Sequence, residues 1–453
     1  MAYDLIIRHG TVVTPEGEAH ADVAVADGVI AAVGPELAGD AREELDARGL
    51  HLFPGLIDAH VHFNEPGRAD WEGWATGSAA LAAGGGTVAV EMPLNANPPT
   101  CDAASFAQKL AYAEANALTD FALWGGLVPG DLSRLDELAA SGVIGFKAFM
   151  SASGTPEFAA ADDLTLYEGM ARAARLNLPV AVHAESEALT AALAARAVAA
   201  GRLSARDYLE SRPVVAELEA IQRALLFAAE TGCRLHIVHV SCGRGVALVS
   251  EARARGVDVT CETCPHYLVL TDEDVERIGA AAKCAPPLRA SADQAELWAR
   301  LFAGEVAFVA SDHSPAPATM KGQSQAGFFG IWGGIAGAQS TLELLLTEGH
   351  HRRGLSLPAI AALTAANVAK RLRLAPRKGT IAPGADADLA LVDLGVEWTL
   401  SSDDLRDRHR LSPYIGRALR GRVVRTLRRG QTIYHQGRVA EGAGGRLIRP
   451  GGL

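Results

Sequence analysis

The chain has 453 residues, of which 49% are hydrophobic and 21% are charged, and its formal net charge is −11. This composition is typical of a globular protein and excludes a disordered or fibrous one. Lys and Arg form no long basic block, so we expect no nucleic-acid partner. The first residues lack a signal-peptide pattern and no apolar run is long enough to span a bilayer, so we expect a cytoplasmic protein without a membrane partner.

The pattern of apolar residues changes twice along the chain. Residues 3–52 alternate in short strands with turns, which indicates a small β-sheet. From residue 53, short apolar runs alternate with Ala/Leu/Glu-rich segments of helical period, and after about residue 375 the alternating strands return. The predicted strands of the middle region are LIDAHVHF, TVAVEMP, FALWGGL, IGFKAFM, LPVAVHAE, RLHIVHV, VDVTCETC and VAFVASDH.

Eight apolar strands separated by helices predict a parallel sheet that closes into a barrel. We therefore predict an α/β protein with a TIM-like (β/α)₈ barrel at residues 53–375. The strands at residues 1–52 and 376–453 would combine into one small composite β-sandwich domain, followed by a tail.

Side chains that can bind metal ions close five of the eight predicted strands. Barrel enzymes carry their chemistry at the C-terminal ends of the strands, so these side chains would meet on one rim. Imidazoles and a carboxylate are suitable ligands for Zn²⁺ and related divalent ions. A lone histidine that closes a strand is more often a hydrogen-bonded core or surface residue than a ligand, and an Asp before a His can cap a turn, so only their joint occurrence favours a metal centre. The candidates are His60, His62, Lys147, His183, His239 and Asp312.

Lys147 differs from the other candidates because a protonated amine repels cations. A desolvated, neutral amine can instead add carbon dioxide, and the resulting carbamate (N6-carboxylysine) has two oxygens that can bridge two metal ions. The alternative is a lysine that pairs with an acid at the barrel mouth, and its position leaves both interpretations open.

Seven motifs follow one another along the chain: PGLIDAHVHFNEPG, GFKAFM, HAE, HIVHVS, CETCPHYL, KCAPPLR and SDHSP. In this order they resemble the cyclic amidohydrolases of the metal-dependent amidohydrolase superfamily. The stretches NEPGRADWEGWATGSAALAAGGGTVAVEMPLNANPPT, IWGGIAGAQS and LSPYIGR are similar to the allantoinase branch of that family.

The resemblance implies two divalent metal ions per subunit, Zn²⁺ in the first place and Co²⁺ or Mn²⁺ as alternatives. It also implies a homotetramer and a small-molecule substrate, allantoin, whose five-membered ring is opened to allantoate in purine (ureide) catabolism. Two metals can lower the pKa of a shared water toward about 7, and Asp312 would transfer the proton of that water to the leaving ring nitrogen. One metal would be bound by His60, His62, carbamylated Lys147 and Asp312, and the other by Lys147, His183 and His239.

Position 64 bears on the choice of substrate. Dihydroorotases carry an arginine there, which binds a substrate carboxylate, whereas Asn64 is neutral and suits a ring with a neutral ureido group. Hydantoinases and dihydropyrimidinases are the nearer alternative, dihydroorotase is a more distant one, and a non-catalytic scaffold is the third. The residues expected near the substrate are Asn64, Asn95, Ser151, Cys284 and Gly333.

Two connections are long for a barrel of this kind. They are residues 151–163 and the segment SPAPATMKGQSQAGFFG. Long connections in compact domains are often active-site lids, so we expect both to lie over the barrel mouth.

Overall fold

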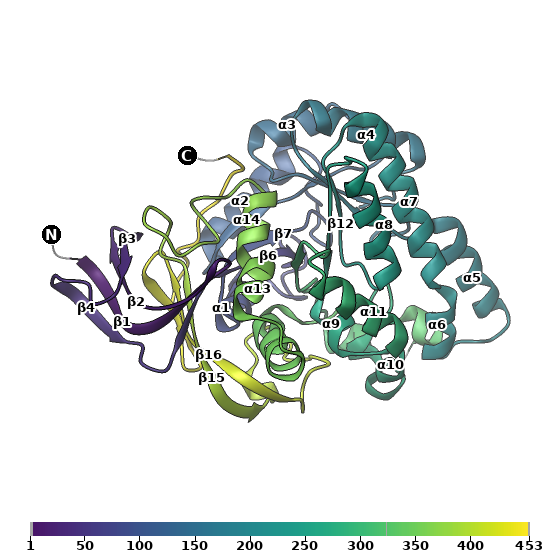
Figure 1. Cartoon of the computed structure of the whole chain (residues 1–453). Coiled ribbons are helices and arrows are strands. Elements are labelled where there is room, and N and C mark those ends of the chain that lie inside the picture. Colours follow the sequence, from purple (N-terminus) through teal and green to yellow (C-terminus); the bar gives the residue numbers. More distant parts are fainter. Residues whose placement is uncertain (1–2, 323, 452–453) are drawn as a thin grey trace.

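The computed structural model describes residues 3–322 and 324–451, and it has the two parts that the sequence predicts. A barrel of parallel strands is surrounded by helices, and a β-rich domain lies against one side of it (Figure 1). Every predicted barrel strand is present. The barrel strands are β6 (Leu56–Val61), β7 (Gly86–Glu91), β8 (Asp120–Leu123), β9 (Gly125–Gly126), β10 (Phe146–Phe149), β11 (Val180–His183), β12 (Leu235–Ile237), β13 (Val259–Thr263) and β14 (Phe308–Val309).

The third strand of the barrel is divided at Trp124. Its first part, β8, pairs with β7, and its second part, β9, pairs with β10, so the ring of strands continues across the division. A parallel bridge between Val61 and His313 joins the first strand to the end of the last one and closes the barrel. Nearly all residues of these strands are buried, which explains their continuous apolar runs.

Helices cover the outside of the barrel (Figure 1). The sequence defines several of their ends: Asp102 caps α2 through the backbone N–H of Ser105, and α7 ends at Gly232, whose φ of 68° suits glycine. The helices are α1 (Trp74–Ala83), α2 (Ala103–Asn116), α3 (Arg134–Ser141), α4 (Asp163–Arg175), α5 (Glu187–Ala199), α6 (Ala205–Ser211), α7 (Val214–Thr231), α8 (Gly243–Ala254), α9 (Pro265–Val269), α10 (Asp272–Ile278), α11 (Ser291–Phe302), α12 (Thr341–Leu344), α13 (Leu357–Ala361) and α14 (Asn367–Arg371).

The second part is a composite β domain made from both ends of the chain. Strand β5 pairs with β1 on one side and with β15 on the other, which joins the N-terminal and C-terminal strands in one nine-stranded sheet. Its strands are β1 (Tyr3–Thr14), β2 (Gly17–Ala26), β3 (Val29–Gly34), β4 (Ala41–Asp46), β5 (His51–Pro54), β15 (Leu389–Thr399), β16 (Ala418–Arg428), β17 (Gln431–His435) and β18 (Arg438–Val439).

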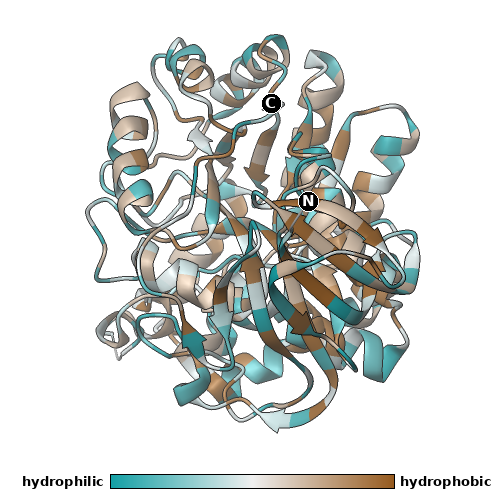
Figure 2. Cartoon of the chain, turned by 90° about the vertical axis from the view of Figure 1, so that its left-hand side faces the viewer, coloured by the Kyte–Doolittle hydropathy of each residue, from teal (hydrophilic) through white to brown (hydrophobic). Residues whose placement is uncertain are grey.

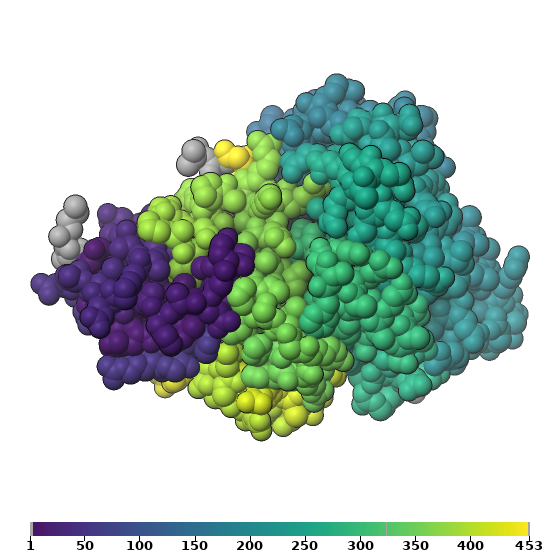
Figure 3. Space-filling model, in the orientation of Figure 1, coloured from purple at the N-terminus to yellow at the C-terminus, as the bar shows by residue number. Residues whose placement is uncertain are grey.

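This sheet forks at β1, because β2 occupies one edge of that strand while β4 and β5 share the other. The strands enclose a separate apolar core that includes Ile7, Val23, Leu52 and Leu389. Figure 2 shows many brown, hydrophobic segments along these strands, and Figure 3 shows the purple N-terminal residues on the same side as the yellow C-terminal ones. The composite β domain is therefore confirmed, and its limits at residues 52/53 and 375/376 remain a prediction.

A buried ion network connects the β domain to the barrel. The ammonium of Lys378 lies 2.7 Å from Asp120 of β8, 2.8 Å from Asp386 and 2.6 Å from Asp388. Arg429, at the end of β16, also pairs with Asp120. Among residues 3–322 and 324–451, no helix is both long and apolar enough to cross a membrane.

Candidate metal centre and substrate cavity

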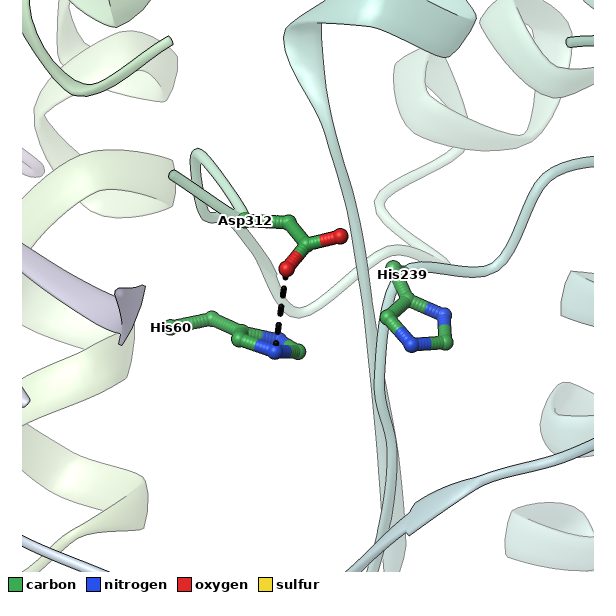
Figure 4. Close-up of side chains that lie close together, drawn as sticks. All are labelled: His60, His239 and Asp312. Carbon is green, nitrogen blue, oxygen red and sulfur yellow. Dashed lines mark ion pairs between the residues drawn. The ribbon is translucent and has the colours of Figure 1, made fainter. Parts of the chain in front are cut away.

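Three side chains that can bind a metal ion meet at the C-terminal rim of the barrel. His60 lies in β6, His239 follows β12 and Asp312 follows β14, and one ligand atom of each lies within 4.8 Å of the other two. Figure 4 shows both rings and the carboxylate around the same space. A fourth side chain joins them, because Asp312 Oδ1 lies 3.3 Å from His60 Nε2 and 3.4 Å from His62 Nε2. The structure thus brings together residues that are up to 252 positions apart in the chain, from 60 to 312.

The backbone is strained where two of these residues leave their strands. His239 has a φ of 38° and Asp312 a φ of 47°, a region that residues other than glycine seldom adopt. Such strain costs on the order of 1–3 kcal/mol and clusters at functional sites. It indicates that the direction of these two side chains matters more than local stability.

His183, at the end of β11, faces the same rim. Its Nδ1 lies 3.0 Å from His239 Nε2, so two ring nitrogens converge on one point. Burial lowers the pKa of His183, and it holds the pKa of His60 and His239 well below the usual value. The imidazoles are therefore neutral, which is the form that binds metal ions.

Lys147 lies in β10 and is completely buried. Among the described residues, its Nζ has no hydrogen-bond partner. Burial lowers the pKa of Lys147 to about 7, against the opposing effect of the Glu262 and Asp312 carboxylates. A substantial fraction of this amine is therefore neutral near pH 7, as carbamate formation requires.

Two buried carboxylates that the sequence analysis missed orient the histidines. Glu262 of β13 contacts His60 Nδ1 at 2.6 Å and His236 Nε2 at 3.1 Å. Glu185 contacts His183 Nε2 at 2.9 Å and accepts hydrogen bonds from Arg212 at 2.6 and 3.1 Å. A signal for Glu262 was present, because a carboxylate inside the apolar strand VDVTCETC needs a buried partner. Carboxylates bonded to the second ring nitrogen fix the orientation of ligating histidines in many metal sites.

A cavity of about 440 Å³ opens above these residues. His60, His62, His183, His239 and Asp312 lie at its base, and loop residues form its walls. Both long connections contribute: Ala152, Ser153 and Gly154 come from the first, and Met320, Phe329 and Gly330 from the second. The expectation that these connections lie at the barrel mouth is confirmed.

The residues expected near the substrate divide into two groups. Asn95, Cys284 and Gly333 line the cavity. Asn64 and Ser151 are buried and do not line it. The amide of Asn64 and the hydroxyl of Ser151 have no hydrogen-bond partner among the described residues.

Arg212 and Lys283 also line the cavity, and groups of the chain itself already bond both. The guanidinium of Arg212 is bound by the Glu185 carboxylate. The ammonium of Lys283 donates hydrogen bonds to backbone carbonyls of residues 328, 329 and 331. Among the residues that the structure describes, both cations in the walls above the rim are therefore already engaged, Arg212 by a carboxylate and Lys283 by backbone carbonyls.

The model of the Amidohydrolase family matches residues 51–433, which is most of the chain. The chain belongs to the amidohydrolase family. Membership implies divalent metal ions and a small-molecule substrate, and the buried cluster of imidazoles and carboxylate at the rim agrees with this.

Curated members of this family match the chain from end to end. The allantoinase of Rubrobacter xylanophilus is 64% identical over 449 residues, which cover 99% of this chain and 98% of the relative. The allantoinase of Solibacter usitatus is 58% identical over 447 residues, covering 99% and 97%. The allantoinase of Deinococcus radiodurans is 56% identical over 453 residues and covers 100% of both chains.

Solved structures of other amidohydrolases are also similar. The L-hydantoinase (dihydropyrimidinase) from Arthrobacter aurescens superposes with a TM-score of 0.96 at 35% identity, and the match covers 99% of this chain and 100% of the other. The dihydropyrimidinase from Brevibacillus agri has a TM-score of 0.92 at 32% identity, with 99% of each chain covered.

Proposed function

We propose that this amidohydrolase opens the ring of allantoin by hydrolysing its cyclic amide bond, which gives allantoate. One observation carries the proposal: relatives named allantoinase match at 56–64% identity over nearly their whole length. The hydantoinases and dihydropyrimidinases among the similar structures match at 35% identity or less.

The proposal includes two divalent ions per subunit, with zinc preferred over cobalt or manganese, and a carbamate on Lys147. The donor set fits such a centre, because burial keeps the imidazoles of His60 and His239 neutral and the amine of Lys147 is buried without a partner among the described residues. His60, His62, Lys147 and Asp312 would hold one ion, and Lys147, His183 and His239 the other. When bound, the ions supply Lewis-acid polarisation of the ring carbonyl and a water pKa lowered toward about 7.

Within this centre, Asp312 is the residue that moves the proton. Its carboxylate lies beside two imidazoles at the base of the cavity, where a ring carbonyl would enter. Asp312 takes the proton of the attacking water and delivers it to the ring nitrogen, which then leaves as a neutral amine. Glu262 and Glu185 hold the imidazoles in place while this happens.

The cavity also favours a neutral ring over an acidic one. Arg212 and Lys283 are the cations in its walls, and both are bound by groups of the chain itself. A dihydroorotate carboxylate would therefore have to compete with these partners, whereas a neutral ureido group would not. The neutral Asn64 at the position where dihydroorotases carry arginine agrees with this selectivity.

Hydantoin or dihydropyrimidine hydrolysis is the second candidate, because the fold superposes with those enzymes at TM-scores of 0.91–0.96. A non-catalytic scaffold is disfavoured, since every proposed metal ligand is present in the sequence. A cytoplasmic homotetramer without nucleic-acid or membrane partners remains a prediction from the sequence.

The test is ring opening by the zinc-loaded protein, supplied with bicarbonate, of allantoin, hydantoin, dihydrouracil and dihydroorotate in parallel. We expect the highest kcat/KM for allantoin. Faster opening of hydantoin or dihydrouracil would replace allantoin as the proposed substrate but keep the proposed chemistry. If protein with about two ions per chain opened none of the four rings, the proposal of an enzyme would be refuted.

A further inference from the structure

Lys283 has an environment that the proposed chemistry does not explain. It follows the short turn Gly279–Ala282, and only 4% of its surface is exposed. No carboxylate of the described residues pairs with its ammonium. Instead, Nζ donates hydrogen bonds to the carbonyl oxygens of Phe328 at 2.7 Å, Phe329 at 3.4 Å and Ile331. All three carbonyls belong to residues 327–334, which we call the mouth segment.

Other contacts fix the position of this ammonium. The ring of Tyr208, in α6, lies with its centroid 4.4 Å from Lys283 Nζ, a cation–π contact. The Tyr208 hydroxyl donates to the carbonyl of Cys284 at 3.0 Å, and the backbone N–H of Gly334 donates to the carbonyl of Lys283 at 2.7 Å. Lys283 thus lies against an aromatic ring and bonds the mouth segment twice, through its side chain and through its backbone carbonyl.

The mouth segment is one wall of the substrate cavity. Residues 329–334 all line it. The ring of Trp332 packs edge-on against that of Trp71, with centroids 4.7 Å apart, so the wall closes against the loop that follows β6. A Cβ at Gly333 would meet no atom closer than 3.9 Å, because this glycine faces open space in the cavity. The position of the mouth segment therefore limits which ring substituents the cavity can hold.

Burying an ammonium without a counter-charge is unfavourable, and burial lowers the pKa of Lys283 to about 7. A methionine of similar length would avoid this cost but could not bond the carbonyls. We propose that Lys283 is a positioning residue that fixes the mouth segment and thereby sets the affinity and selectivity of the cavity for ring substituents. The proposal rests on the proposed function of that cavity, but it assigns Lys283 no contact with the reacting atoms.

The experiment compares wild type with Lys283→Met, and with Lys370→Met on the outside of α14 as the control. Hydrogen exchange of the substrate-free protein reports the mouth segment directly, since the amides of Phe328, Trp332 and Gly334 are hydrogen-bonded. We expect exchange of these amides to become about tenfold faster or more in Lys283→Met, the effect of losing hydrogen bonds to a charged group, and to stay unchanged in Lys370→Met. The metal content should not change.

The second readout is KM and kcat, measured with whichever of the four ring substrates is opened fastest. We expect KM to rise about tenfold in Lys283→Met with kcat within about threefold of wild type, because binding is lost rather than chemistry. The ratio of kcat/KM between substituted and unsubstituted rings should fall.

Unchanged exchange with unchanged KM would overturn the proposal, and so would a loss of kcat without a change in KM. If Lys283→Met does not fold, Lys283→Gln replaces it, since the amide can still donate to one or two of the carbonyls, and we expect intermediate exchange and KM. Exchange is independent of the substrate, so the proposal can fail or hold separately from the allantoin assignment.

Discussion

Two clusters of ligand-capable side chains lie among the residues that the structure describes, and they differ in where their positive charge comes from. His60, His239 and Asp312 meet at the barrel rim, while Asp120, Asp386 and Asp388 meet where the barrel joins the β domain. In the second cluster the ammonium of Lys378 lies within 2.8 Å of all three carboxylates. At the rim, by contrast, the nearby lysine is Lys147, and its amine has no partner among the described residues.

The surroundings of the two lysines shift their pKa values in opposite directions. The three carboxylates raise the pKa of Lys378 although burial opposes them, whereas burial lowers the pKa of Lys147 to about 7. A cluster that holds its own cation is a structural ion network, whereas a cluster of neutral imidazoles and one carboxylate beside an unpaired amine is suited to bind cations from solution. Counting ligand-capable residues alone does not separate these cases.

The largest effect is expected from Asp312→Asn at the rim. The amide keeps the shape and one oxygen of the carboxylate but cannot accept the proton, so kcat should fall by about 10³-fold or more while the metal content stays near two ions per chain. Turnover and elemental analysis of the same sample check this. Turnover near the wild-type level in a metal-replete sample would remove Asp312 from the proton-transfer role.

Lys378→Met is the matching change in the second cluster. It leaves buried carboxylates without their central cation, so the free energy of unfolding should fall by about 3–5 kcal/mol. Urea denaturation measures the change, with the exposed Lys370→Met as control. Metal content and kcat of the folded fraction should match wild type, and a loss of metal in Lys378→Met would contradict the distinction between the two clusters.

Glu262→Gln tests whether the carboxylate that contacts His60 increases the affinity of the rim for metal ions. Glu262 accepts a hydrogen bond at His60 Nδ1 and so orients that imidazole, and we expect metal affinity to weaken by about 10–100-fold in Glu262→Gln, measured by competition with a chelator. Glu343→Gln is the matched control, because Glu343 is equally buried and bonds the backbone of Val423 away from the rim. Equal affinities in the two variants would refute the role of Glu262.

The sequence was sufficient to predict the barrel, because parallel strands buried on both faces require continuous apolar runs. It also predicted which strands end in ligand-capable residues, since strand ends of a barrel share one rim. It could not predict the partners behind them. Glu262 bonds His60 across 202 positions and Lys378 bonds Asp120 across 258, and no local pattern encodes such pairs.

Lys283 shows a different limit. Its partners are backbone carbonyls, which every residue carries. The residue types of the mouth segment therefore give no basis for predicting the contact. Likewise, neither the division of the third strand at Trp124 nor the absence of Asn64 and Ser151 from the cavity wall follows from spacing, because both depend on how the loops pack. The geometry of the loops above the rim could therefore be obtained only from the structure and not from the sequence.

The smallest effect, from Asp386→Asn, gives the sharpest test of the comparison. Asp386 bonds both Lys378 and the half-exposed Arg377, whereas Asp120 and Asp388 stay with Lys378 after the change. Because the ammonium keeps two carboxylates, we expect a loss of only about 1–2 kcal/mol in the free energy of unfolding, close to one hydrogen bond to a charged group. Elemental analysis of the zinc-loaded protein should give the same ion count as wild type. A lower count would mean that the acidic cluster binds metal despite its lysine, and the source of positive charge would then fail as the criterion that separates the two clusters.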